Sequence, residues 1–179
     1  MRWPLRPAAF LAVFPCFLPV PSYIGRLPPP GHPTYPIRAA RVGGGCARQL
    51  PPDRPLRIVD IGSGLGGLVL DLARRRPDCE LSGIELAPLP WLASSLRARA
   101  TGSRARFLRG DYESLNFGNY DVVFAYLSPA AMGGLWRKAE AEMRPGSVLV
   151  SYEFDIVERE PDRRIVTTDS RKILHIWHF

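Results

Sequence analysis

Residues 57–67 read Arg57-Ile58-Val59-Asp60-Ile61-Gly62-Ser63-Gly64-Leu65-Gly66-Gly67. The first half of this segment is apolar and β-branched, which is typical of a buried strand, and residues 68–76 carry apolar side chains at helical spacing. Glycines between a strand and a helix let the backbone turn sharply and approach a ligand closely. The segment therefore predicts a strand, a glycine-rich turn and a helix that together bind a nucleotide-like cofactor.

The glycine spacing fits two cofactor motifs equally well. With Gly62, Gly64 and Gly67 the pattern is G-x-G-x-x-G, which is typical of dinucleotide binding, and with Gly66 as the third glycine it is G-x-G-x-G. Asp60 separates the two, because a carboxylate beside the turn would oppose a pyrophosphate resting on the helix N-terminus. The same carboxylate would favour a cofactor that carries an ammonium group, such as S-adenosylmethionine.

Two further acidic residues follow predicted strands. Glu85 ends an apolar segment about 20 residues beyond the turn, where a carboxylate can accept hydrogen bonds from both hydroxyls of a ribose. Asp111 follows residues 106–108, where it can accept from an adenine amino group while Tyr112 covers the ring. Because the carboxyl ends of parallel strands meet at one edge of a sheet, Asp60, Glu85 and Asp111 are expected to converge there.

These segments resemble the cofactor signature of class I S-adenosylmethionine-dependent methyltransferases. The matching residues are 59–66 (Val-Asp-Ile-Gly-Ser-Gly-Leu-Gly), 83–85 (Gly-Ile-Glu) and 110–111 (Gly-Asp), and the resemblance extends over residues 55–151. Residues 83–88 are similar, in particular, to a small group related to the animal mitochondrial protein-lysine methyltransferases, although Leu65 and Ala87 depart from the pattern of that group. The resemblance implies S-adenosylmethionine as the cofactor, with contacts from Asp60, Gly62, Ser63, Gly64, Gly66, Glu85, Leu86, Asp111 and Tyr112.

The rest of the chain alternates predicted strands with predicted helices, which favours an α/β fold with a parallel sheet. Residues 164–168 and 172–177 predict an antiparallel hairpin, since only residues 169–171 separate them. We therefore expect a Rossmann-like three-layer sandwich whose mostly parallel sheet ends in an antiparallel edge hairpin. The further strands are expected at residues 81–85, 104–108, 120–126 and 147–152, and the further helices at residues 88–100 and 130–143.

In a domain of this class, the methyl acceptor would meet the cofactor at the end of the fourth strand. Ser128 and Pro129 lie there and are partly like the loop that holds an amine in amino-group methyltransferases, so they are the candidate catalytic residues. An alternative interpretation is a strand that ends in a helix begun by proline. Transfer from a sulfonium needs mainly alignment and desolvation, so no general base is predicted. His175 and His178 should lie on opposite faces of a strand, and no metal site is predicted.

Composition divides the chain near residue 52. Residues 1–52 contain no Asp or Glu, six Arg and twelve of the 19 Pro, whereas residues 53–179 hold 18 basic and 17 acidic residues. The basic surplus thus belongs to the first segment, and nucleic-acid binding is not expected. We interpret residues 1–52 as a leader and linker and residues 53–179 as the cofactor-binding domain, which should fold without the first 50 residues.

The leader allows several interpretations. Residues 8–20 form an apolar run after a basic start, which fits an export signal, a membrane-contacting anchor or a mitochondrial transit peptide, and a disordered or misassigned start is the alternative. The three Cys lack metal or redox spacing, which favours a cytoplasmic location for the domain. The leader keeps a membrane or an organelle as the alternative, and the sequence defines no oligomeric state.

These observations give one leading hypothesis and three alternatives. No insertion long enough to form a lid follows Asp111, and an open cleft suits a protruding side chain of a protein, so we expect methyl transfer to a protein amino group, that of lysine. The alternatives are a small-molecule methyltransferase and a binding or assembly module that has lost its acceptor site. A fourth hypothesis, an NAD-dependent enzyme, is disfavoured by Asp60.

Overall fold

The computed structural model describes residues 42–45, 47, 50–51, 53–167 and 172–179. All of them belong to one compact unit, Pro33–Phe179. The apolar run at residues 8–20 and the hairpin turn at residues 169–171 lie outside the described residues. Within the described part of the chain, no helix has the length and apolar character that crossing a bilayer requires.

A seven-stranded sheet organises the unit, with the strand order β3-β2-β1-β4-β5-β7-β6. Strands β1 to β5 pair in parallel, and β7 runs antiparallel between β5 and β6. The strands are β1 (Arg57–Ile61), β2 (Glu80–Glu85), β3 (Arg106–Arg109), β4 (Val122–Ala125), β5 (Val148–Tyr152), β6 (Arg163–Val166) and β7 (Ile173–His178). The helices are α2 (Gly67–Arg75), α3 (Pro88–Ala100) and α4 (Pro129–Glu142), and two single 3₁₀ turns are η1 (Tyr112–Ser114) and η2 (Phe117–Asn119).

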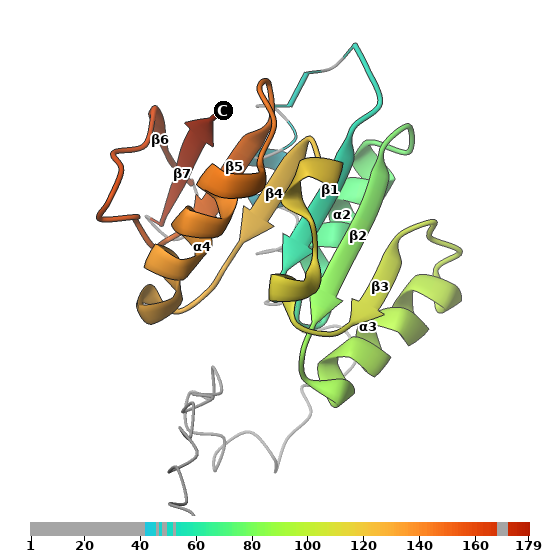
Figure 1. Ribbon diagram of the computed structural model, residues 1–179. Coiled ribbons are helices and arrows are strands. Elements are labelled where there is room, and N and C mark those ends of the chain that lie inside the picture. Colours follow the sequence, from blue (N-terminus) through green and yellow to red (C-terminus); the bar gives the residue numbers. More distant parts are fainter. Residues whose placement is uncertain (1–41, 46, 48–49, 52, 168–171) are drawn as a thin grey trace, which may run out of the picture. The chain divides into compact units, whose positions relative to one another are not determined.

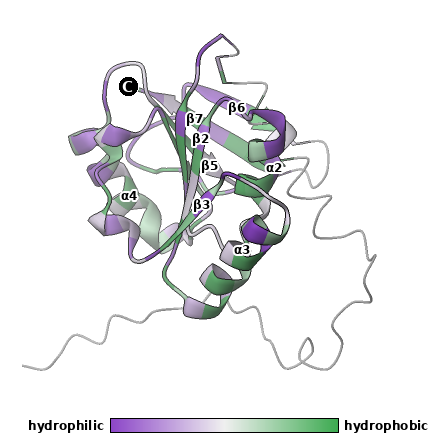
Figure 2. Cartoon of the chain, turned by 90° about the vertical axis from the view of Figure 1, so that its right-hand side faces the viewer, coloured by the Kyte–Doolittle hydropathy of each residue, from purple (hydrophilic) through white to green (hydrophobic). Residues whose placement is uncertain are grey.

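The sheet is the middle one of three layers. Helices α2 and α3 lie on one face and α4 lies on the other, which the two views in Figure 1 and Figure 2 show together. Strand β4 is buried along its whole length, as expected of a parallel strand that is covered on both faces. The predicted three-layer sandwich with a mostly parallel sheet and an antiparallel C-terminal hairpin is confirmed.

The structure differs from the predicted elements mainly between β3 and β4. The sequence predicts no regular element there, but η1 and η2 form because Asp111 and Asn116 cap them. The Asp111 side chain accepts a hydrogen bond from the Glu113 amide, and the Asn116 side chain accepts one from the Gly118 amide. Such short polar caps compete with longer helices or strands, so each turn ends after three residues.

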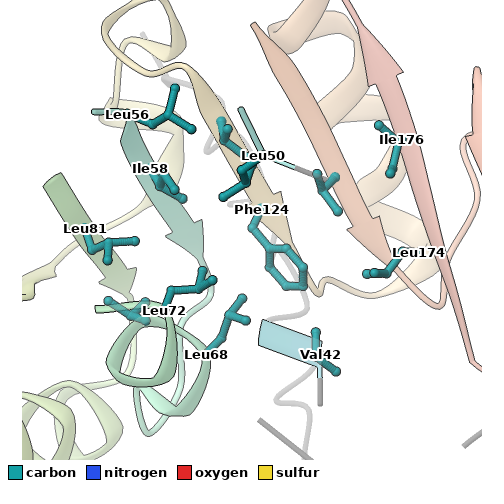
Figure 3. Close-up of a cluster of buried hydrophobic side chains, with 13 residues drawn as sticks. Val42, Leu50, Leu56, Ile58, Leu68, Leu72, Leu81, Phe124, Leu174 and Ile176 are labelled. Carbon is teal, nitrogen blue, oxygen red and sulfur yellow. The ribbon is translucent and has the colours of Figure 1, made fainter. Parts of the chain in front are cut away.

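Part of the predicted linker packs into the core of the domain. Residues 42–45 and 47 are helical, and the side chains of Val42 and Leu50 are buried in the same cluster as Phe124, Leu174 and Ile176 (Figure 3). Figure 3 shows Leu50 beside Phe124 and Val42 below its ring. The domain boundary at residue 53 stays a prediction, but apolar side chains on its upstream side belong to the same core.

Candidate functional site

The glycine turn after β1 adopts a backbone shape that only glycine takes easily. Gly62, Gly64 and Gly66 have φ angles of 71°, 53° and 73°, in the left-handed region, whereas Gly67 begins α2. The three left-handed glycines follow the G-x-G-x-G spacing. The amides of Gly62 and Ser63 donate to the Ile84 carbonyl at 2.9 and 3.0 Å, which fixes the turn against the end of β2.

Glu85 ties the turn to the end of β2. Its Oε2 accepts a hydrogen bond from the Gly64 amide at 2.8 Å, and its Oε1 accepts one from the Ala87 amide at 2.9 Å. An ionised carboxylate has about four acceptor positions, so two remain for further donors such as ribose hydroxyls. The Gly110 amide donates to the Glu85 carbonyl at 3.1 Å, which brings the end of β3 beside the same residue.

Asp60 has an unusual environment for a carboxyl group. Only 6% of its surface is exposed, and its side chain makes no hydrogen bond within the described residues. Burial, and then the charge of Glu85, raises the pKa of Asp60 to about 8. The hydroxyl of Ser63, in the adjacent turn, is also buried without a partner among the described residues. Buried polar groups are normally paired, so these two indicate a site that a polar ligand completes.

The third acidic residue and its neighbours lie at the end of β3. Asp111 is exposed and caps η1, while Tyr112 is half-buried with its ring stacked on Phe117 at 6.4 Å between centroids. Burial and the nearby Glu113 raise the pKa of Tyr112 to about 12, so the phenol stays neutral. Leu86 is 54% exposed and therefore has an apolar surface free for a ring. The cofactor contacts of these three residues stay predictions.

The predicted catalytic loop lies against the glycine turn. A Cβ placed on Gly62 would lie 3.0 Å from Cδ2 of Leu127, so the segment after β4 contacts the first glycine directly. Ser128 caps α4 and Pro129 is its first residue, as the alternative interpretation of the loop expects. The Ser128 side chain makes no capping hydrogen bond, and the role of both residues in methyl transfer stays a prediction.

The two C-terminal histidines are held apart. His175 is buried with Nδ1 at 3.4 Å from Asp155, and His178 is exposed with Nδ1 at 3.2 Å from Asp162. Desolvation by burial lowers the pKa of His175 despite the nearby Asp155 charge. Among the described residues, no group of three or more potential ligands comes together as a metal site would require.

Sequence reasoning missed a group of residues on the acceptor side of the site. One groove is lined by Asp60, Gly62 and Ser63 of the turn and, beyond the ends of β4 and β5, by Tyr126 and Tyr152. Lys172, which precedes β7, lines the same groove. Aromatic residues that end two neighbouring central strands were the available signal.

The cofactor predicted from the sequence fits this arrangement. The left-handed glycines leave backbone space, Glu85 has acceptor capacity to spare, and the buried carboxyl of Asp60 lacks the cation that an amino acid ammonium would supply. A Rossmann-like sheet with these groups at its carboxyl edge defines a class I S-adenosylmethionine-dependent methyltransferase domain. The chain belongs to the family of the ANTKMT methyltransferase domain, whose model matches residues 60–163.

Individual relatives agree with this classification. The chain is 39% identical over 110 residues to demethylmenaquinone methyltransferase of Thermus thermophilus, covering 56% of this chain and 48% of that protein. It is 32% identical over 108 residues to an ATP synthase lysine N-methyltransferase of Mus musculus, covering 59% of this chain and 42% of that protein. The chain thus spans about half the length, or less, of these curated relatives.

A solved structure shares the fold over most of the chain. The crystal structure of an RNA methyltransferase from Salinibacter ruber in complex with S-adenosylhomocysteine superposes with a TM-score of 0.65 and covers 86% of this chain and 92% of its own. At 24% sequence identity this similarity supports the fold alone. The recognition of a class I methyltransferase and of its cofactor from the sequence is confirmed by the family match.

Proposed function

We propose that the protein transfers the methyl group of S-adenosylmethionine to the amino group of a lysine in another protein. The observation that carries this proposal is the shared groove, because Asp60, Gly62 and Ser63 line one part of it and Tyr126 and Tyr152 line another. An acceptor that enters over β4 and β5 would therefore approach the cofactor turn directly.

The chemistry requires positioning more than proton transfer. The cofactor supplies a sulfonium whose methyl group is electrophilic, so that a neutral amine displaces the sulfur in line. Asp60 would hold the ammonium of the cofactor, and the free acceptor positions of Glu85 would take the ribose hydroxyls. The Ser128 hydroxyl, which makes no capping bond, would accept a hydrogen bond from the incoming amine and keep its lone pair directed at the methyl group.

Two relatives support different acceptors. The lysine assignment rests on the family match and on the mouse relative, whose name specifies a lysine N-methyltransferase. The higher identity to the Thermus relative, 39% against 32%, favours the second candidate, a small-molecule acceptor. The two candidates share the cofactor site and differ only in what enters the groove.

The decisive experiment supplies the full chain with radiolabelled S-adenosylmethionine and a cell extract divided into protein and small-molecule fractions. Labelled protein that disappears when the extract lysines are acetylated beforehand supports lysine methylation. Label in the small-molecule fraction alone would overturn it in favour of the second candidate. Cofactor binding by calorimetry without label in either fraction would instead indicate a module that has lost its acceptor site.

A further inference from the structure

An ammonium group is already bound in the acceptor part of the groove. The rings of Tyr126 and Tyr152 meet edge to face at 5.3 Å between centroids, and Phe154 stacks on Tyr126 at 6.0 Å. Nζ of Lys172 lies 5.4 Å from the centroid of Tyr126 and 5.5 Å from that of Tyr152. Both distances lie within the range in which the negative face of an aromatic ring attracts a cation, about 6 Å.

Polar contacts complete the enclosure of this ammonium. Lys172 donates to the Tyr126 hydroxyl at 3.2 Å and forms an ion pair with Glu153, to which the Tyr126 hydroxyl also donates at 2.9 Å. Burial acts to raise the pKa of Glu153, but the hydrogen bonds from Lys172 and Tyr126 outweigh it and lower that pKa, so the carboxylate is charged. We call Tyr126, Tyr152, Glu153 and Phe154 the aromatic cage.

The backbone at the cage is strained in order to aim its carboxylate. Glu153 is the only non-glycine residue with a positive φ, 77°, among those that the structure describes. Such a conformation costs about 1–3 kcal/mol and persists only where the surroundings enforce it, which occurs most often at functional sites. Here the Glu153 amide donates to the Ile173 carbonyl at 2.7 Å, which fixes the turn beside β7.

The cage also lies in the right place for methyl transfer. Tyr126 directly follows β4, and its neighbour Leu127 contacts Gly62 of the cofactor turn. Tyr126, Tyr152 and Lys172 line the same groove as Asp60 and Ser63. A cation in the cage therefore shares one groove with the cofactor turn.

From this arrangement we infer that the aromatic cage is the subsite for the ammonium-bearing end of the acceptor, and that Lys172 occupies it as an internal competitor until the acceptor displaces it. The inference rests on the proposed function, since it names the acceptor subsite and a regulatory contact of that activity. The four-carbon stem and ammonium of Lys172 have the chemistry of the lysine side chain that the enzyme would methylate. Removal of this side chain should open the subsite.

The chain offers a matched control for this test. It contains only two lysines, Lys138 and Lys172. Lys138 also lies over an aromatic ring, at 5.0 Å from the Phe117 centroid, and pairs with Glu142 at 2.7 Å, but it belongs to α4 and is not among the residues that line the groove. The two lysines thus have the same local chemistry in different places.

The test measures binding of n-butylammonium, which equals the lysine side chain, to the full chain by ligand-observed NMR with S-adenosylhomocysteine present. Lys172→Met should bind the probe at least tenfold more tightly than the wild type, whereas Lys138→Met and Lys172→Arg should not. The double variant Lys172→Met/Tyr126→Leu should lose the gain. Thermal melting confirms that each variant is folded before it is scored.

Unchanged binding by folded Lys172→Met, or an equal gain in Lys138→Met, would overturn the inference. Because the probe assay requires no methyl transfer, its failure is separable from failure of the proposed function. Labelled lysine in extract proteins combined with no probe binding would reject the cage while leaving the methyltransferase activity in place. Probe binding that depends on Tyr126 supports the cage whatever the extract shows.

Discussion

Asp60 and Glu85 end the neighbouring parallel strands β1 and β2, and the charge of Glu85 adds to burial in raising the pKa of Asp60. The two carboxyl groups therefore differ in state near pH 7, because Glu85 accepts two backbone hydrogen bonds while Asp60 is buried and unpaired among the described residues. This difference gives each a separate task toward a ligand that carries both a cation and hydroxyl groups.

The first prediction concerns stability against pH. Between about pH 4 and 8 the folded protein keeps the Asp60 proton and the unfolded chain does not, so stability falls as pH rises through this window. Asp60→Asn removes the effect, and its stability relative to the wild type should grow by up to about 1.4 kcal/mol per pH unit before levelling above pH 8. Urea unfolding of both proteins at several pH values checks this, and parallel curves would contradict it.

A second prediction follows for cofactor binding. An ammonium placed beside Asp60 would favour its charged form, so binding of S-adenosylmethionine near pH 7 should release a proton from this residue. Calorimetry in buffers of different ionisation enthalpy measures the release. It should vanish in Asp60→Asn, which should also bind the cofactor more weakly. A binding enthalpy that is independent of buffer in the wild type would place the cofactor ammonium elsewhere.

Glu85→Ala should weaken S-adenosylmethionine binding by about 1–3 kcal/mol, the cost of losing charge-assisted hydrogen bonds. The loss has two sources, because the carboxylate also holds the Gly64 and Ala87 amides that shape the turn. Glu80→Ala is the matched control at the exposed start of the same strand, where only an ion pair with Arg57 is lost. Equal affinity of the two variants would show that Glu85 does not contact the cofactor.

Two glycines separate the fold from the site. Gly64 and Gly102 both have left-handed φ, 53° and 63°, and a Cβ on either would meet nothing within 4 Å. Alanine should therefore destabilise the fold similarly at both positions, by about 1–2 kcal/mol of backbone strain. Only Gly64→Ala should weaken cofactor binding, because its Cβ would enter the space over the turn. Denaturant unfolding and calorimetry together distinguish the two effects.

A fifth prediction concerns the domain boundary. A chain that begins at residue 53 lacks Val42 and Leu50, whose burial contributes about 1.5–3 kcal/mol each. It should fold but unfold at a lower denaturant concentration than a chain that begins at residue 33, the start of the compact unit. Coincident unfolding curves would show that the upstream residues add nothing to the core.

The local pattern of the sequence was sufficient for the parallel part of the fold and for the cofactor turn. Strand β1 and its glycines identify themselves through β-branched residues and through positions that require left-handed φ, and Glu85 follows at a fixed distance along the chain. The hairpin of β6 and β7 was also predictable, because a short connection leaves an antiparallel partner as the simplest solution.

The acceptor side could not be predicted in the same way. Tyr126 and Lys172 are 46 residues apart in sequence, and they meet only because β7 inserts next to β5. The positive φ of Glu153 has no sequence signature, since the residue type is unsuited to it. The packing of Val42 was likewise hidden, because its segment is short and surrounded by glycine and proline.

The unpaired carboxyl of Asp60 has a consequence for how long the protein persists in a cell. A ligand that binds only the folded state raises its stability with the logarithm of ligand concentration. Because the buried group destabilises the ligand-free protein at neutral pH, that state is the one open to unfolding and proteolysis. Turnover of the protein should therefore slow when S-adenosylmethionine is abundant and quicken when it is scarce, which couples the amount of the enzyme to its methyl donor.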